Sequence, residues 1–198
     1  MADDYQSDSA QEAEITARAL LQRMVAGDEE AAGAFFAMFE TAICRYVRHV
    51  VPDISEDDLG DVVQETFLAA LRNAAQYRGE SRVSTWLLRI AHHKSADWLR
   101  RQRVLRRFLA PFTHREESLS PRPRVAGSDE ADPSADALAV RMALGKLPLE
   151  QRQALVLRYV MGLSVEEVAA TMRLKHRKVE WLITQGRVAL RALLSSEE

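Results

Sequence analysis

The sequence predicts an all-α protein of two small helical domains joined by a flexible linker, the second domain being a helix-turn-helix. Apolar residues recur every three or four positions over residues 15–108 and 137–194, and nowhere show the two-residue alternation of a half-buried strand. Between these stretches, residues 109–136 contain four prolines, one glycine and several serines, without any apolar period. Such a composition is typical of a linker.

The chain begins with an acidic segment, residues 1–14, which has few apolar groups and is expected to form a disordered tail. A first helix is expected over residues 15–26, because its apolar side chains follow helical spacing and Gly27 comes directly after them. Asp28 is a typical N-cap for a second helix, whose aromatic and aliphatic residues continue until Pro52.

A third helix is expected to begin after Ser55, because Asp58 stands three residues later, in an arrangement close to a capping box. The helical pattern breaks around Gly79, and a long fourth helix is expected from about residue 83 to residue 108. The four helices together form the first expected domain, residues 15–108.

The second expected domain, residues 137–198, contains four short helical patterns. Ser164 and Glu167 have the spacing of a capping box before an apolar run. Only a few residues separate the last two patterns, which is typical of a helix-turn-helix whose final helix is the recognition helix. The four patterns cover residues 137–145, 148–161, 164–172 and 175–194.

Charge is distributed unevenly along the chain, although the net charge is only −2. Residues 1–66 carry a net charge of −11, residues 82–107 carry +7 and residues 173–191 carry +5. Two basic stretches in an otherwise acidic chain suggest two contacts with a polyanion. The alternative, two solvated helix faces, stays open on composition alone.

The start of the expected recognition helix is strongly basic. The N-terminal end of such a helix enters the major groove, where donors to base edges and phosphates are needed. This pattern by itself predicts binding to duplex DNA. A pair of ordinary antiparallel helices with a solvated face is the alternative. The basic residues are Lys175, His176, Arg177 and Lys178.

The other basic stretch interleaves aromatic and cationic residues, which is a combination that can stack unpaired bases while holding phosphates. Trp86 and Trp98 are equally compatible with a role as core anchors, since their spacing places them within about 120° on a helix. The cations in question are Arg89, Lys94, Arg100, Arg101 and Arg103.

Several classes of protein are excluded or disfavoured. No apolar run approaches the roughly 18–20 residues of a membrane span, and the acidic start is unlike a signal peptide, so a cytoplasmic location is expected. Cys44 is the only cysteine, which excludes an intrachain disulfide and a cysteine-rich zinc site. No catalytic motif is present and the five histidines lack ligand spacing. The protein is therefore predicted not to be an enzyme and to need no cofactor or metal.

Three segments resemble the extracytoplasmic-function (ECF) sigma factors, the smallest members of the bacterial sigma-70 family. The resemblance covers nearly everything outside the tail and the linker, with three motifs in the same order and at matching separations. The segments are D-L-G-D-V-V-Q-E-T-F-L-A-A-L (58–71), Y-R-G-E-S-R-V-S-T-W-L-L-R-I-A-H-H-K-S-A-D-W-L-R-R (77–101) and L-P-L-E-Q-R-Q-A-L-V-L-R-Y-V-M-G-L-S-V-E-E-V-A (147–169).

The resemblance implies a factor that binds core RNA polymerase and directs promoter-specific initiation. Residues 15–108 would be similar to sigma region 2, which binds the polymerase and reads and opens the −10 element. Residues 137–198 would be similar to region 4, which reads the −35 element as duplex. Many members of the family are held inactive by an anti-sigma factor, which is a further candidate partner.

The resemblance also implies roles for individual residues. The polymerase-binding residues would be Asp58, Asp61, Gln64, Glu65 and Phe67. The −10 residues would be Arg78, Ser84, Thr85, Trp86, Arg89, His93, Lys94, Asp97, Arg100 and Arg101. The −35 residues would be Ser164, Lys175, His176, Arg177, Lys178 and Arg187.

The chain departs from the family pattern at a few of these positions. Gly60 stands where an acidic residue is common, and His93 replaces a frequent asparagine. In the recognition helix, cations are missing at three positions. Either the basic cluster 175–178 compensates by shifting phosphate contacts to earlier positions of the helix, or Trp181 and Leu182 face a protein partner and −35 binding is weak. The three positions where cations are missing are Glu180, Leu182 and Gln185.

For the chain as a whole, a stand-alone helix-turn-helix regulator is the alternative function.

The linker is long enough for the implied role. If the two promoter elements lie about 23 base pairs apart, their centres are roughly 80 Å apart at ~3.4 Å per step. A linker of about 28 residues reaches at most ~90–100 Å when extended. The two domains can therefore engage both elements without full extension of the linker.

Overall fold

The computed structural model describes residues 2–109 and 135–195, and every regular element in these two ranges is helical. The all-α prediction is therefore confirmed. The first range holds α1 (Ala2–Val25), α2 (Glu29–Val50), α3 (Glu56–Asn73), a 3₁₀ turn η1 (Ala74–Gln76) and α4 (Val83–Leu109). The second holds α5 (Ala135–Lys146), α6 (Leu149–Leu155), a π-helical segment η3 (Val156–Val160), α7 (Val165–Met172) and α8 (His176–Ser195). Most of the expected linker, residues 110–134, lies outside the described residues.

The helix starts follow the caps expected from the sequence. The Asp28 side chain accepts the N–H of Ala31 at 3.0 Å, and Ser55 Oγ accepts the N–H of Asp58 at 3.1 Å. Satisfying these otherwise unpaired N–H groups stabilises the first turns of α2 and α3. The stripe of α2 that was expected to be apolar is buried against α3 and α4, with Phe35 and Tyr46 fully enclosed.

Helix α1 starts much earlier than expected. The sequence predicted disorder over residues 1–14, whereas α1 begins at Ala2. Contacts of Glu14 fix the C-terminal end of this segment. Its carboxylate pairs with Arg18 at 2.8 Å and accepts the backbone N–H of Val83 at 3.0 and 3.1 Å. This contact joins positions far apart in the chain, so the local composition gave no sign of it.

The helix-turn-helix has the expected local structure with two irregularities. Both bonds of the capping box are present, from the N–H of Glu167 to Ser164 Oγ and from the N–H of Ser164 to the Glu167 carboxylate. The expected helix over 148–161 is α6 followed by the π-helical turn η3. Arg173, between α7 and α8, is the only described non-glycine residue with positive φ, at 54°.

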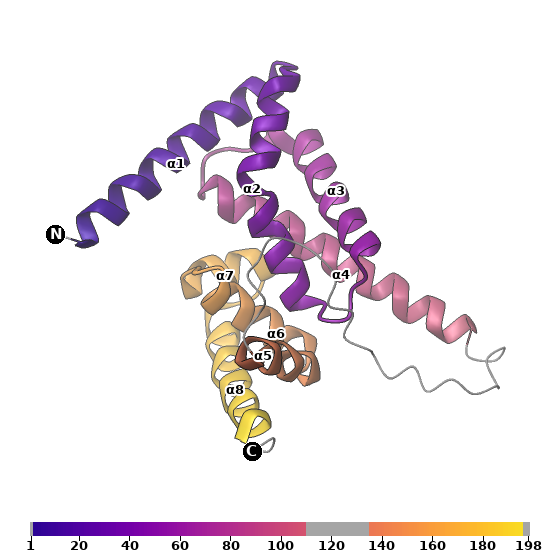
Figure 1. Ribbon diagram of the computed structural model, residues 1–198. Helices are drawn as coiled ribbons and strands as arrows, with labels where there is room; N and C mark the ends of the chain where they lie inside the picture. Colours follow the sequence, from indigo (N-terminus) through magenta and orange to yellow (C-terminus); the bar gives the residue numbers. More distant parts are fainter. Residues whose placement is uncertain (1, 110–134, 196–198) are drawn as a thin grey trace.

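The two expected domains pack against each other. Figure 1 shows α5, α6, α7 and α8 gathered below α2 and α4, and contacts join α4 to α7 and α2 to α5 and α6. One continuous cluster of buried apolar side chains includes residues of both domains. The sequence indicated two domains on a tether, but nothing in it indicated this packing.

Candidate nucleic-acid interface

The exposed face of α3 carries most of the expected polymerase-binding residues. Asp61 and Gln64 are exposed, and Asp58 is half-buried in the first turn, where it accepts a hydrogen bond from Ser55 Oγ at 2.6 Å. Phe67 differs from the others, because its ring packs on Phe36 with centroids 4.6 Å apart. Phe67 therefore supports the core beneath the acidic face and keeps only part of its ring accessible.

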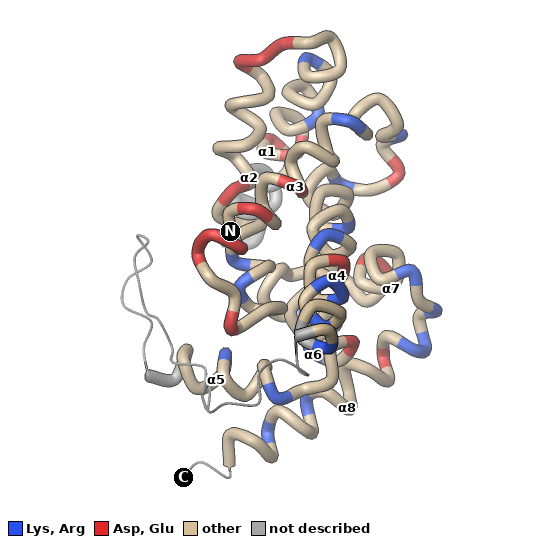
Figure 2. Tube along the Cα trace, turned by 90° about the vertical axis from the view of Figure 1, so that its right-hand side faces the viewer, with Lys and Arg blue, Asp and Glu red and all other residues tan. Residues whose placement is uncertain are grey.

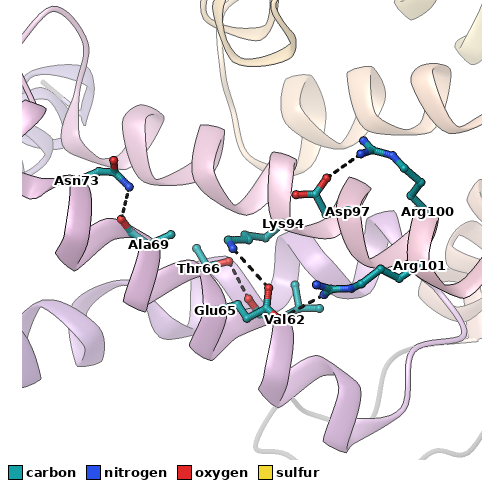
Figure 3. A network of polar contacts seen from close by, with 9 residues as sticks. All are labelled: Val62, Glu65, Thr66, Ala69, Asn73, Lys94, Asp97, Arg100 and Arg101. Atoms are coloured by element: carbon teal, nitrogen blue, oxygen red, sulfur yellow. Dashed lines mark hydrogen bonds and ion pairs between the residues drawn. The ribbon is translucent and has the colours of Figure 1, made fainter.

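Glu65 links the acidic face of α3 to the cationic helix α4. Its carboxylate lies 3.4 Å from Lys94 Nζ and 3.3 Å from Arg101 Nη2, as Figure 3 shows. Farther from α3, Arg100 pairs with Asp97 at 3.2 Å within α4. Two cations that were expected to hold DNA are thus partly neutralised by an acid that was expected to bind polymerase.

The N-terminal half of α4 borders a cavity of about 1220 Å³ between the two domains. Trp86 packs on Tyr77 with ring centroids 5.5 Å apart, so one face of the indole is used in packing. Trp98 also packs against the core with part of its surface exposed. Each indole is thus partly packed and partly exposed, so the stacking role of the two tryptophans stays a prediction. The expected −10 residues that line the cavity are Arg78, Thr85, Trp86, Arg89 and His93, whereas Ser84 lies outside it.

The neighbouring histidines His92 and His93 have different environments. His92 is buried, and its Nδ1 lies 3.1 Å from the hydroxyl of Tyr46. Burial, and secondly the charge of His93, lowers the pKa of His92 to about 4. His93 lines the cavity, where burial and then Arg173 lower its pKa. Both rings are therefore neutral at physiological pH, and His93 is the one that faces the cavity.

The basic cluster at the start of α8 is exposed. Figure 2 shows Lys and Arg residues gathered where α7 leads into α8, and a second group along α4. Lys175, Arg177 and Arg187 are exposed. His176 lies 3.1 Å from Glu166, and Lys178 lies 3.6 Å from Glu150 and 4.6 Å from the centroid of the Trp181 ring. Acidic neighbours therefore reduce the charge that part of this cluster presents.

Ser164 has a structural role that accounts for its hydroxyl. It caps α7 by accepting the N–H of Glu167 at 3.2 Å. The cap uses an acceptor lone pair of this oxygen and not its O–H, so the cap is compatible with the expected −35 contact, which stays a prediction.

Comparisons with known proteins show which family this chain resembles. Residues 35–104 match sigma-70 region 2, and residues 137–190 match sigma-70 region 4. The chain is 32% identical over 188 residues to the RNA polymerase sigma factor CnrH of Cupriavidus metallidurans, and the match covers 91% of this chain and 95% of that protein. It is 27% identical over 169 residues to the ECF RNA polymerase sigma factor SigX of Bacillus subtilis, covering 82% and 83%.

The chain belongs to the ECF sigma factors of the sigma-70 family. It is a sigma factor that directs RNA polymerase to promoters. The solved structure of CnrH in complex with the cytosolic domain of CnrY is similar as well, with a TM-score of 0.66 and 28% identity over 92% of this chain and 99% of that one.

The departures of this sigma factor from the family pattern have different structural consequences. Leu182 is only 2% exposed and belongs to the core, so the expectation that it faces a protein partner is wrong. Glu180, Trp181 and Gln185 are exposed. Gly60 is exposed on α3, with no atom within 4 Å of where a Cβ would stand, so packing does not require glycine there.

Three residues at the contact between the two domains were not predicted from the sequence. Arg173 and Glu166 line the cavity opposite α4, and Arg152 reaches from α6 to the end of α2. The turn position of Arg173, where helices commonly end in a left-handed residue, was a usable signal. Nothing in the local pattern marks Arg152, because its acceptors lie at helix ends and loops that only the fold brings together.

Proposed function

We propose that this sigma factor binds core polymerase through the acidic face of α3, reads the −10 element with α4 and the loop before it, and reads the −35 element with the start of α8. The observation that carries the proposal is the separation of charge among exposed surfaces. Asp57 and Asp61 are exposed acids of α3, whereas the cations lie along α4 and at the α7–α8 turn (Figure 2), and Glu65 stands at the border between the two groups. Opposite charges on separate surfaces suit one basic protein partner and one polyanion.

The proposed polymerase surface centres on Asp61 and Gln64, which are exposed and lie on one side of α3. Glu65 contributes its charge while holding Lys94 and Arg101 in place. A basic partner surface that approaches α3 would weaken these two ion pairs. The cations of α4 would then become more available to DNA phosphates.

The proposed −35 surface is formed by Lys175, Arg177 and Arg187 on exposed positions of α8 and the preceding turn. His176 and Lys178 contribute less, since each has an acidic neighbour. Glu180 adds a negative charge to the same surface. Affinity for the −35 duplex therefore depends on few phosphate contacts.

The proposal also covers the cellular location of the protein and a further partner. Within residues 2–109 and 135–195, no helix has the length and apolarity needed to cross a membrane. The protein would act in the cytoplasm, by binding alone and without catalysis of its own. An anti-sigma factor is a further proposed partner, supported by the related CnrH, which was solved in complex with the cytosolic domain of CnrY.

In-vitro transcription with purified core polymerase and genomic fragments tests the proposed function. We expect starts at specific promoters that require both the polymerase and this chain. Replacing Asp61 or Lys175 should reduce these starts. The proposal would be abandoned if the free chain bound duplex DNA tightly in a gel shift while no polymerase-dependent start was found.

A further inference from the structure

The recognition helix α8 buries one face and exposes the opposite one. Val179, Leu182 and Ile183 are at most 8% exposed. A Cβ atom added at Gly186 would lie 3.0 Å from Leu155 Cδ1, so the backbone of α8 is in close contact with α6 there. At 3.6 residues per turn, these four positions of α8 lie within about 100° of one another. The helix therefore has a defined inner face, and the residues half a turn away from it face outward.

Trp181 is a large apolar side chain on the outward face. It is turned by about 150° from the middle of the buried face, one turn after Arg177. Its exposed fraction is 51%. Its surroundings are cationic, since Lys175, Arg177 and Lys178 are exposed at the start of the same helix or just before it. A half-exposed indole among cations is typical of a binding surface, because it offers apolar area next to charge.

Lys178 holds the indole of Trp181 in this orientation. Its Nζ atom lies 4.6 Å from the centroid of the ring, within the range of a cation–π interaction. The same Nζ atom lies 3.6 Å from the Glu150 carboxylate of α6. The ammonium group thus connects the ring to a neighbouring helix. A side chain that is already oriented loses less conformational freedom when a partner binds.

The position of Trp181 along α8 suits the major groove of DNA. Helix α8 begins at His176, so Trp181 lies in its second turn. At 1.5 Å per residue, this is about 7–8 Å from the start of the helix. The N-terminal part of a recognition helix enters the major groove, which is about 8.5 Å deep. The three cations near the ring favour a polyanion as the partner of this face.

The chemistry of the indole selects one group in the major groove. Its Nε1–H only donates, and the rest of the ring is apolar. The apolar group that base edges present in the major groove is the C5-methyl of thymine. Cations are missing at Glu180, Leu182 and Gln185, which leaves fewer phosphate contacts. An apolar contact therefore contributes a larger share of the affinity.

We propose that Trp181 determines part of the −35 specificity by packing its indole on thymine methyl groups in the major groove. The proposal rests on the proposed −35 role of α8. It adds a residue that selects A·T pairs to cations that contact phosphates of any sequence. It requires at least one A·T pair in the −35 element.

Replacing thymine with uracil in the −35 element provides the test, because uracil lacks the methyl group and retains every hydrogen-bonding group. The DNA fragments come from a promoter at which polymerase with this chain starts transcription, and competition measures the affinity of this holoenzyme for each fragment. The thymine fragment should bind more tightly by about fourfold for each methyl group that the indole covers. Trp181→Ala should bring this ratio to one. Trp181→Phe should keep part of it, since a smaller ring still contacts the methyl group.

Two controls limit the effect to this contact. Uracil in place of thymine between the two promoter elements should leave the affinity unchanged. Tyr159→Ala, at an aromatic position of η3 that is 56% exposed, should keep the full ratio. Because the ratio compares two fragments bound by the same protein, a variant that is partly unfolded does not change it.

Equal affinity of the unmodified holoenzyme for both fragments would overturn the role of Trp181, as would a ratio that Trp181→Ala leaves intact. The indole would then be left to a protein partner. A −35 element without any A·T pair would contradict the proposal as well. Lys175→Ala with Arg177→Ala separates these results from a failure of the proposed function. A loss of affinity in this variant would keep α8 at the −35 element, whereas no loss would overturn −35 binding by α8 together with the role of Trp181.

Discussion

The carboxylate of Glu14 in α1 accepts the backbone N–H of Val83, the first residue of α4, at 3.0 and 3.1 Å. An acidic side chain from a distant helix thereby caps the helix that carries the proposed −10 surface. The negative charge also suits the positive end of the dipole of α4. The position of α1 is thus coupled to the start of α4.

Replacing Glu14 with alanine should lower the stability of the protein by about 1 kcal/mol, since it removes both the cap on α4 and the pair with Arg18. Thermal unfolding followed by circular dichroism measures the change. Glu14→Gln should retain most of the stability, because the amide oxygen still accepts. Glu12→Ala, at an exposed position of the same helix, is the control, and an equal decrease there would contradict the cap.

The negative charge on the exposed face of α3 can be either reduced or increased by substitution. Asp61→Lys should weaken core polymerase binding by about tenfold through like-charge repulsion. Gly60→Glu should strengthen binding, since it adds an acid at an exposed position with open space around it. Affinity measured by fluorescence anisotropy checks both changes. Glu29→Lys, at an exposed position in the first turn of α2, is the control, and an effect there as large as that of Asp61→Lys would refute the α3 surface.

The basic cluster before and within α8 should determine the salt dependence of duplex binding. Lys175→Ala with Arg177→Ala should reduce the slope of log affinity against log salt by ~0.9 for each DNA phosphate that is no longer neutralised. Titrations of a promoter fragment at several salt concentrations give this slope. Arg191→Ala, an exposed cation near the end of α8, should leave it unchanged. An unaltered slope in the double variant would remove the two residues from the interface.

Arg173 stores backbone strain in the turn of the helix-turn-helix. Its φ of 54° lies in the left-handed region, which costs a residue with a Cβ roughly 1 kcal/mol relative to glycine. Arg173→Gly should therefore raise the midpoint of thermal unfolding. Arg173→Ala removes the same side chain but keeps the strain, so it should not. A rise of similar size in both variants would trace the effect to the side chain.

His92 should make the stability of the protein depend on pH. Burial, and then the neighbouring His93, lowers its pKa to about 4, below the usual value near 6.5 of an unfolded histidine. The folded state therefore binds fewer protons between these values, and stability falls as the pH drops from about 6.5 to about 4, by up to about 3 kcal/mol.

The variant His92→Gln should flatten this dependence, because the amide can still bond the Tyr46 hydroxyl but does not titrate in this range. Urea unfolding at pH 5 and pH 7 measures the difference. His176→Gln, at an exposed position of α8, serves as the comparison. A decrease of stability at pH 5 in His92→Gln as large as in the unmodified chain would assign the dependence to other groups.

The local sequence pattern predicted which residues form much of the proposed binding surfaces. It did not predict the ion pairs between them. The exposed cations of α8 and the acids of α3 stand where helical spacing and the family motifs predicted them. That Glu65 holds Lys94 and Arg101 was not predicted, because the pair joins two helices. Leu182 was misjudged for a similar reason: its burial depends on packing from elements that precede it in the chain.

The amino-acid sequence alone determined the all-α class, the caps at Asp28, Ser55 and Ser164, and membership in the sigma factors. These features depend on neighbours within a few residues or on motifs that can be recognised without coordinates. Only the tertiary structure decided that Glu14 caps α4 and that Thr85 meets Glu167. Such contacts form between groups far apart in the chain, and their energies exist only once packing has brought the partners together.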